Sequence, residues 1–445
     1  MALTGLEIYK LLPKKNCGEC GPPTCLAFAM SLAAGKATLD TCPYVTDDAK
    51  EALGSASAPP IKLIKIGTGE KTVELGDETV LFRHDKTFFH PTGVAFEVLD
   101  SLSADDLEQK LKEINALEFD RVGLHYDVDM VAVKQTGDVG QFVQAVQKVS
   151  QGTALALVLM TEEPAAATAA LEVCKDRNPL LYAATESNYT EMTEVAKKYN
   201  VPLGVKAENI FKLAELVEKI TALGYKELVL DSGARGTSQT LADFTEMRRA
   251  AIKKKFRPFG YPTVAFTTVE DPMEEIVQAQ VYATKYASMV VIKATAKHHV
   301  LPLLTWRQNL YTDPQKPIQV ESKIYEVGNV TPDSPVYLTT NFSLTYFSVE
   351  GEVEGSKVPS YIIPVETDGT SVLTAWAAGK FTAEKIAEVL NSIGITDKVN
   401  HREVILPGYV AVLSGKLEEK SGWKVIVGPR EAAGIPAFAK SRYGA

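Results

Sequence analysis

The chain has 445 residues, of which 45% are hydrophobic and 23% charged, and its formal net charge is −9. This length exceeds what one hydrophobic core supports, so we expect roughly two to four domains. The acidic balance argues against nucleic-acid binding, because such proteins neutralise phosphates with basic surfaces. No apolar run is long enough to span a bilayer and no secretory signal opens the sequence, so we expect a cytoplasmic protein without membrane contact.

Four of the five cysteines lie close together near the N-terminus. They are Cys17, Cys20, Cys25 and Cys42. In a reducing compartment, the spacing Cys-x2-Cys-x4-Cys-x16-Cys predicts a metal site before it predicts disulfides. Gly18 and Gly21 permit the tight backbone turns that three converging thiolates require. A short helix at 26–35 then leads to the fourth cysteine.

Two kinds of metal site fit four thiolates. Structural zinc takes such a set, but zinc sites more often show two Cys-x2-Cys pairs. Here three cysteines come from one loop, and the fourth precedes Pro43, a Cys-Pro pair that also closes the ligand set of some bacterial ferredoxins. We therefore expect a 4Fe–4S cluster, with zinc as the open alternative. The remaining Cys174, alone in a helical pattern, is interpreted as a buried structural thiol.

Beyond a Ser-, Ala- and Pro-rich linker at 47–60, short apolar strands alternate with helical patterns as far as residue 311. The expected strands are 79–84, 121–126, 154–160, 180–185, 202–206, 228–232, 263–267 and 289–294. The expected helices include 105–116, 142–150, 209–223, 241–254 and 273–288. Eight such repeats predict a TIM (β/α)8 barrel. The first strand is not followed by Gly-x-Gly-x-x-Gly, which argues against an open dinucleotide-binding sheet.

A proline-rich stretch at 312–335 predicts a second linker, after which a smaller α/β unit begins. Its expected strands are 336–340, 361–365, 403–406 and 423–427, with a helix that ends near residue 393. This pattern predicts a flavodoxin-like (Rossmann-type) sheet, whose ligands bind at the carboxyl ends of the strands. The expected organisation is a cluster domain with its linker at 1–60, a barrel at 61–312, a linker at 313–335 and an α/β domain at 336–445.

The candidate binding residues follow the strands of this last domain, where Gly, Thr and Ser let the backbone approach a bulky ligand. They are Thr339, Thr340, Asn341, Thr345, Asp368, Gly369, Thr370, Ser371, Val372, Leu373, Gly408, Tyr409, Gly428, Pro429, Arg430, Glu431, Ala433 and Gly434. Each of them can also be read as an ordinary turn residue.

The order of these parts resembles the large (gamma) subunit of corrinoid iron–sulfur proteins over essentially the whole chain. The resemblance rests on the cysteine spacing, on Asn16-Cys17-Gly18-Glu19-Cys20-Gly21 and on Gly369-Thr370-Ser371-Val372. It implies a methyl carrier of the reductive acetyl-CoA (Wood–Ljungdahl) pathway of carbon dioxide fixation. The cobalt of a cobamide then accepts a methyl group from methyltetrahydrofolate through a partner methyltransferase and donates it to acetyl-CoA synthase.

The resemblance further implies that the 4Fe–4S cluster reduces inactive Co(II) to Co(I). It also implies a heterodimer with a smaller barrel-type subunit, with the corrinoid at the junction, and contact with acetyl-CoA synthase/CO dehydrogenase. The carrier role assigns no catalytic residue to this chain. The two linkers would let the cluster domain and the C-terminal domain approach different partners in turn.

The axial ligand of the cobalt is the point at which the sequence departs from many cobalamin-binding domains. Those domains carry Asp-x-His-x-x-Gly after the first strand, and the His binds cobalt. Here residues 339–343 contain no His, and the last His of the chain, His401, precedes the third strand. We therefore expect a base-off cobamide without a His ligand, because a weak axial donor favours Co(I).

Two other functions remain open from the sequence. The barrel can itself be a pterin methyltransferase, with polar residues at its strand ends. The candidates are Asp127, Glu186, Asn188, Asp231 and Arg235. The chain can also be an iron–sulfur electron-transfer protein without a corrinoid, whose C-terminal loops are empty or hold a flavin.

Overall fold

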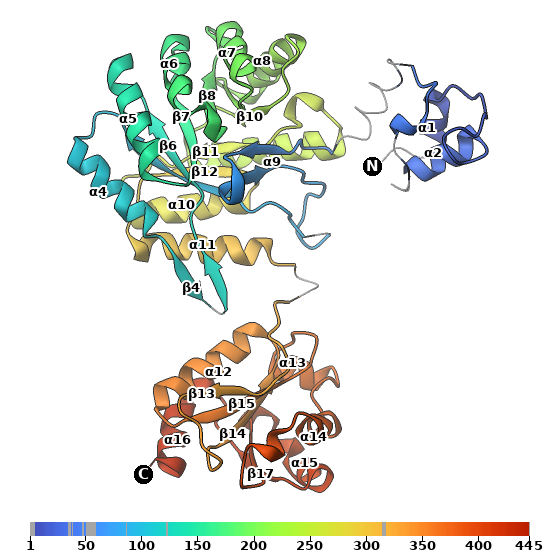
Figure 1. The fold of residues 1–445 in the computed structure, drawn as a ribbon, viewed down its shortest axis with the longest axis vertical. Coiled ribbons are helices and arrows are strands. Elements are labelled where there is room, and N and C mark those ends of the chain that lie inside the picture. Colours follow the sequence, from blue (N-terminus) through green and yellow to red (C-terminus); the bar gives the residue numbers. More distant parts are fainter. Residues whose placement is uncertain are drawn as a thin grey trace.

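The computed structural model describes residues 5–33, 37, 39–46, 49, 59–85, 87–121, 123–313 and 317–444. Within these ranges the chain forms a small helical module, an eight-stranded parallel barrel and a smaller α/β unit (Figure 1). Most of the linker predicted at 47–60 lies outside the described residues.

The N-terminal module packs two short helices against each other. These are α1 (Gly5–Leu11) and α2 (Cys25–Ala33), followed by the 3-10 turn η1 (Leu39–Thr41). Ile8 and Phe28 share a small buried core with Cys25 and Cys42. Two of the four clustered cysteines therefore form part of the core that holds this module together.

The central sheet consists of eight parallel strands in nearly sequential order. They are β3 (Gly93–Leu99), β6 (Met130–Lys134), β7 (Ala156–Met160), β8 (Leu180–Ala184), β9 (Leu203–Lys206), β10 (Leu228–Asp231), β11 (Val264–Phe266) and β12 (Met289–Ile292). A bridge between Leu230 and Thr263 joins β10 to the start of β11, and β12 pairs with β3. These contacts close the predicted barrel.

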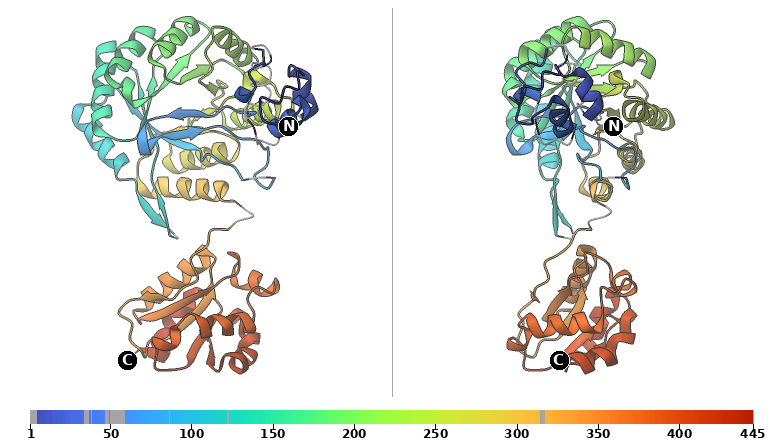
Figure 2. Two further views of the ribbon diagram at one scale, coloured as in Figure 1. Left: turned by 45° about the vertical axis from the view of Figure 1, so that its right-hand side comes forward. Right: turned by 90° about the vertical axis from the view of Figure 1, so that its right-hand side faces the viewer.

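Eight helices follow the barrel strands and surround them (Figure 2). They are α4 (Ala104–Asn115), α5 (Val139–Gly152), α6 (Pro164–Cys174), α7 (Tyr189–Tyr199), α8 (Ile210–Ala222), α9 (Thr237–Lys253), α10 (Pro272–Thr284) and α11 (Lys297–Tyr311). Side chains of Ser103, Asp138, Asn209 and Asp271 accept hydrogen bonds from the first turns of α4, α5, α8 and α10, which fixes where these helices begin. Three 3-10 turns complete the region: η2 (Gly69–Lys71), η3 (Lys175–Arg177) and η4 (Arg257–Phe259).

Two of the eight predicted barrel strands are wrong. Residues 79–84 form no strand, and 124–126 form β5 (Leu124–Tyr126), which pairs antiparallel with β4 (Phe119–Arg121) outside the barrel. The sequence analysis missed β3 and β6, and the two wrong strands stand shortly before them in the sequence. The stretch at 79–84 is held by side chains, since Arg248 donates to the carbonyl oxygen of Val80 at 2.7 Å.

A hairpin seals the amino-terminal end of the barrel. Its strands are β1 (Ile64–Ile66) and β2 (Val73–Leu75), and they pair antiparallel. Ile64, Ile66 and Leu75 are buried in one apolar cluster with interior barrel residues. Gly67, with φ of +87°, has no room for a side chain, because a Cβ there would lie 2.9 Å from the Cβ of Ala156. Access to the barrel interior is therefore left to the opposite end.

The C-terminal unit is a five-stranded sheet with strand order β13-β15-β14-β16-β17. The strands are β13 (Tyr325–Val327), β14 (Val336–Thr340), β15 (Ser360–Val365), β16 (Glu403–Leu406) and β17 (Lys424–Val427). All four predicted strands are confirmed, and they are parallel to one another. Only the edge strand β13 is antiparallel.

Helices cover both faces of this sheet. They are α12 (Ser343–Ser356), α13 (Val372–Ala377), α14 (Ala383–Ser392), α15 (Ser414–Ser421) and α16 (Ile435–Tyr443), with the 3-10 segments η5 (Ile395–Asp397), η6 (Gly408–Leu413) and η7 (Ala432–Gly434). Residues from α13, α14 and α15 share one core with the sheet, and Tyr346 of α12 and Ile435 of α16 belong to a second core.

Much of the predicted linker at 313–335 is hydrogen-bonded to this unit. Its residues include β13, and the backbone N–H of Val320 donates to the carbonyl oxygen of Asn341 at 2.9 Å. The backbone N–H of Ser343 likewise donates to Ile318 at 3.0 Å. Proline content alone predicts an extended chain, but here the extended chain adds a strand to the edge of the sheet.

Candidate functional site

The N-terminal cysteines lie around one loop and the end of η1. The side chain of Asn16 accepts a hydrogen bond from the backbone N–H of Cys25 at 2.8 Å, which ties the start of the loop to the start of α2. The backbone N–H of Gly21 donates to Gly18 at 3.0 Å, and both glycines have positive φ. The sequence analysis predicted this use of the two glycines.

The four thiols differ in exposure but affect one another electrostatically. Cys25 and Cys42 are buried, Cys20 is partly buried and Cys17 is exposed. Burial raises the pKa of the Cys20 thiol, and the nearby Cys42, Cys17 and Cys25 thiols raise it further. Among the described residues, no three His, Cys, Asp or Glu side chains converge as ligands of a single ion. The four thiols thus belong to one small module, and their side chains do not form a preset ligand geometry there.

Cys174 lies apart from this set. It is 4% exposed, and its thiol lies 3.3 Å from the carbonyl oxygen of Ala170 in the same helix. Burial raises the pKa of this thiol to about 12. The prediction that Cys174 is buried is therefore confirmed.

A pocket of about 410 Å³ opens at the carboxyl ends of β14, β16 and β17. It lies beside α12 and the loops that follow the strands. Ten of the candidate binding residues line it: Thr339, Thr345, Ser371, Val372, Leu373, Tyr409, Gly428, Pro429, Arg430 and Glu431. Eight others do not: Thr340, Asn341, Asp368, Gly369, Thr370, Gly408, Ala433 and Gly434.

Several of these eight residues fix the loops that carry the lining residues, without lining the pocket themselves. The buried Asn341 accepts hydrogen bonds from the backbone of Thr367 at 2.9 Å and of Gly369 at 3.2 Å, so it fixes the loop after β15. A Cβ at Gly408 would lie 2.5 Å from the carbonyl oxygen of Gly428, so glycine lets two loops touch. Asp368 forms an ion pair with Lys380 at 3.0 Å and turns outward.

The pocket also contains residues that the sequence analysis missed. They are Tyr337, Leu338, Phe342, Leu344, Ser348, Val349, Ile405, Leu406, Pro407, Ala432 and Ile435. Most lie within strands or along α12, whereas the sequence analysis took residues from the loops. Strand alternation offered one usable signal, because Tyr337 and Thr339 occupy positions i and i+2 and so share a face.

Buried hydroxyl groups without partners mark the wall formed by β14. The side-chain oxygens of Tyr337, Thr339 and Thr340 are buried and have no hydrogen-bond partner among the described residues. Tyr337 and Thr339 line the pocket, whereas Thr340 does not. A buried polar group without a partner is costly. These two oxygens have almost no exposed surface, so a ligand in the pocket would bond them only if the wall shifts.

No His lines this pocket. His401 lies at the other end of β16, where its Nε2 is 3.0 Å from the carbonyl oxygen of Ser334 and its Nδ1 accepts from the backbone N–H of Glu403. Both ring nitrogens therefore have structural partners at the amino end of the sheet.

The polar residues proposed for a barrel active site do not all come together. Asp127 forms an ion pair with Lys71 before β6, at the sealed end of the barrel. Glu186 pairs with Lys219 on the outer helices, and the buried Asn188 bonds the backbone of Thr185 and Glu162. Asp231 and Arg235 meet at the open mouth, with the closest contact at 2.8 Å.

Two family models match this chain. A family described as "CO dehydrogenase/acetyl-CoA synthase delta subunit" matches residues 63–439, and one described as "Putative Fe-S cluster" matches residues 12–44. The second match contains all four clustered cysteines. The chain thus combines an iron–sulfur type module with a region typical of acetyl-CoA synthase subunits.

Relatives that match over the full length of the chain identify its family more narrowly. The chain is 59% identical over 442 residues to the corrinoid/iron-sulfur protein large subunit of Moorella thermoacetica, covering 99% of both chains. It is 36% identical over 452 residues to the acetyl-CoA decarbonylase/synthase complex subunit gamma of Methanothermobacter thermautotrophicus, covering 98% of both. The chain therefore belongs to the family of corrinoid/iron-sulfur protein large subunits and acetyl-CoA decarbonylase/synthase gamma subunits.

Among solved structures, a 7,8-dihydropteroate synthase from Vibrio fischeri covers 50% of this chain, at 16% identity and a TM-score of 0.37. No helix within the described ranges is both long and apolar enough to cross a membrane.

Proposed function

We propose that this chain is a methyl carrier whose C-terminal pocket holds a cobamide and whose N-terminal module holds a 4Fe–4S cluster. The observation that carries the proposal is the pocket at the carboxyl ends of β14, β16 and β17, which is lined by ten of the residues expected to bind the corrinoid. When bound, the corrinoid supplies the cobalt that takes up and hands on the methyl group, and the cluster supplies the electron that restores Co(I). The chain's own residues bind, orient and expose these two groups.

The strand order supports a corrinoid in this position. The parallel strands run second-first-third-fourth, which is the order of flavodoxin-like sheets, and those sheets bind cofactors where the order reverses. That reversal lies between β14 and β16, and Tyr337, Thr339 and Leu406 from these strands line the pocket. A volume of about 410 Å³ is within the usual range for ligand pockets.

The rim of the pocket suits an apolar macrocycle and a partner above it. Three large side chains of the lining are 44 to 46% exposed, namely Leu344, Leu373 and Tyr409. Such a group on a soluble unit is typical of a binding surface. We propose that the macrocycle rests on this rim, and that a smaller barrel-type subunit covers it in a heterodimer.

The absence of His from the pocket lining leads us to propose a base-off cobamide without a protein nitrogen ligand. For the cluster, we propose Cys17, Cys20, Cys25 and Cys42 as the ligands. The exposed Cys17 places one edge of that site at the surface, where an electron-transfer partner can approach. The proposed partners are a methyltetrahydrofolate methyltransferase and acetyl-CoA synthase/CO dehydrogenase, in keeping with the names of the relatives.

An anaerobic visible spectrum with iron and cobalt analysis tests the proposal on the chain purified with its natural subunits. We expect about four irons and one cobalt per chain, with Co(I) absorption on reduction. Iron without cobalt would favour an electron-transfer protein without a corrinoid. Zinc in place of iron would overturn the cluster assignment.

A further inference from the structure

The open mouth of the barrel carries a polar layer that the methyl-carrier function leaves unused. Because strand residues alternate, one inward-facing side chain lies at or near the carboxyl end of each barrel strand, at this mouth. These eight residues are Glu97, Lys134, Met160, Tyr182, Lys206, Asp231, Phe266 and Lys293. The interior positions beneath them are small or apolar, as at Ala95, Ala132 and Val229.

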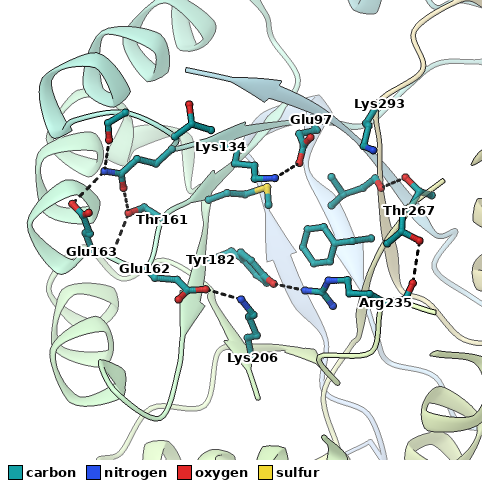
Figure 3. A pocket seen from close by; sticks show the side chains of 17 residues that line it. Glu97, Lys134, Thr161, Glu162, Glu163, Tyr182, Lys206, Arg235, Thr267 and Lys293 are labelled. Carbon is teal, nitrogen blue, oxygen red and sulfur yellow. Dashed lines mark hydrogen bonds and ion pairs between the residues drawn. The ribbon is translucent and has the colours of Figure 1, made fainter. Parts of the chain in front are cut away.

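The mouth encloses a cavity of about 700 Å³, which is larger than the C-terminal pocket. Figure 3 shows charged side chains around an apolar patch. The rings of Tyr182 and Phe266 lie 5.1 Å apart, and the guanidinium of Arg235 lies 4.8 Å from the centre of the Phe266 ring. The cavity therefore offers aromatic rings beside charged side chains.

Buried carboxylates hold this site rigid. Asp231, 1% exposed, accepts hydrogen bonds from the hydroxyl of Tyr182 at 2.5 Å and from Arg235 at 3.0 and 2.8 Å. Glu275, 2% exposed, accepts from the backbone N–H groups of Lys293 and Ala294, both at 2.9 Å. The loops that carry the charges are thus fixed in advance, as a binding site requires.

The floor of the cavity has more positive than negative charge. Lys134, Lys206, Lys293 and Arg235 line it together with the carboxylate of Glu97. The buried Asp231 lies behind the lining and pairs with Arg235. Lys134 bonds Glu97 at 3.1 Å, and Arg235 is matched by Asp231. Lys293 has no ion pair with any side chain that the structure describes.

The rim above this floor is acidic. Lys206 reaches the rim residue Glu162 at 2.7 Å, and both of these side chains are substantially exposed. Glu163, also at the rim, accepts a hydrogen bond from Gln135 at 3.2 Å. These rim carboxylates already have partners, so the cation left over for a ligand is Lys293.

We propose that the barrel mouth is a second small-molecule site, for a ligand that joins a carboxylate or phosphate to a flat apolar body. The oxyanion pairs with Lys293, and the flat body lies against Phe266 and Met160. This site is separate from the corrinoid pocket and does not depend on it.

Calorimetric titration of the purified complex at low salt tests the proposal with two probes, benzoate and phenyl phosphate. Both carry a flat ring, and they differ only in the oxyanion. We expect at least one to bind, with Lys293→Met weakening it about tenfold or more, because a charged hydrogen bond is lost. Lys293→Arg keeps the charge and should retain binding, and added salt should weaken it.

Lys148→Met is the matched control, since Lys148 is exposed on the outer helix α5 and does not line the cavity. It should bind both probes like the wild type. Tighter binding of phenyl phosphate identifies a phosphate ligand, and tighter binding of benzoate a carboxylate. The proposal is wrong if neither probe binds, or if Lys293→Met binds as well as the control. Iron and cobalt contents should be the same in all variants. Ligand binding at the barrel mouth and cofactor binding by the methyl carrier are therefore tested by separate measurements.

Discussion

Replacing Tyr337 by Phe and Thr339 by Val removes two hydroxyl groups from the C-terminal pocket and preserves the shape of both side chains. In the protein without cofactor, each hydroxyl is buried and partnerless. An unsatisfied buried polar group costs about 1 to 3 kcal/mol, so the variant without corrinoid should unfold at the same or a higher temperature. In the cofactor-bound protein, the same double substitution should instead weaken the binding of the cobamide.

If each hydroxyl bonds the cobamide, the double variant loses about 1 to 3 kcal/mol of binding free energy, at about 0.5 to 1.5 kcal/mol per bond. The dissociation constant should then rise about fivefold to 150-fold. Thermal melts of the corrinoid-free protein and an anaerobic absorbance titration with cobamide measure the two effects separately. Thr340→Val is the control, because its hydroxyl is equally buried and partnerless but lies outside the pocket. Unchanged cobamide affinity in the double variant would refute the assignment of these hydroxyls.

Three further predictions concern the cluster, the cobalt ligand and the pocket loops. Cys42→Ser should lower the iron content sharply in metal analysis, whereas Cys174→Ser, remote from the cluster, should leave it unchanged; equal iron in both would contradict the ligand assignment. The electron paramagnetic resonance spectrum of the Co(II) form should show no coupling to an imidazole nitrogen, and such coupling would disprove a His-free site. Gly408→Ala should lower both melting temperature and cobamide affinity, because its Cβ would lie 2.5 Å from the carbonyl oxygen of Gly428, whereas Gly415→Ala, in open space, should do neither.

The sequence predicted the C-terminal sheet well because its strands are apolar runs bounded by clear turn residues. It predicted the barrel's type and missed two of its strands, β3 and β6. The stretches predicted in their place, 79–84 and 121–126, come shortly before them in the sequence. The period of the strand–helix repeat therefore predicted the number of strands, whereas the position of each short strand depends on pairing that local sequence does not contain.

The binding residues were predicted in part for a similar reason. Loop residues such as Tyr409 and Arg430 were found because they follow the strands directly. Asn341 was chosen on the same ground, yet its side chain holds the loop after β15 instead. Tyr337 was overlooked because a tyrosine inside a strand is normally part of the core. Only the three-dimensional arrangement reveals that its hydroxyl has no partner.

The close attachment of residues 318–327 to the C-terminal sheet sets a limit on travel. Helix α11 ends at Tyr311, and the first backbone hydrogen bond to the sheet unit is made by Ile318. About seven residue steps, at most about 3.6 Å each, allow a reach of roughly 25 Å. If the C-terminal unit meets several partners in turn, each of them must approach within this distance of the end of α11.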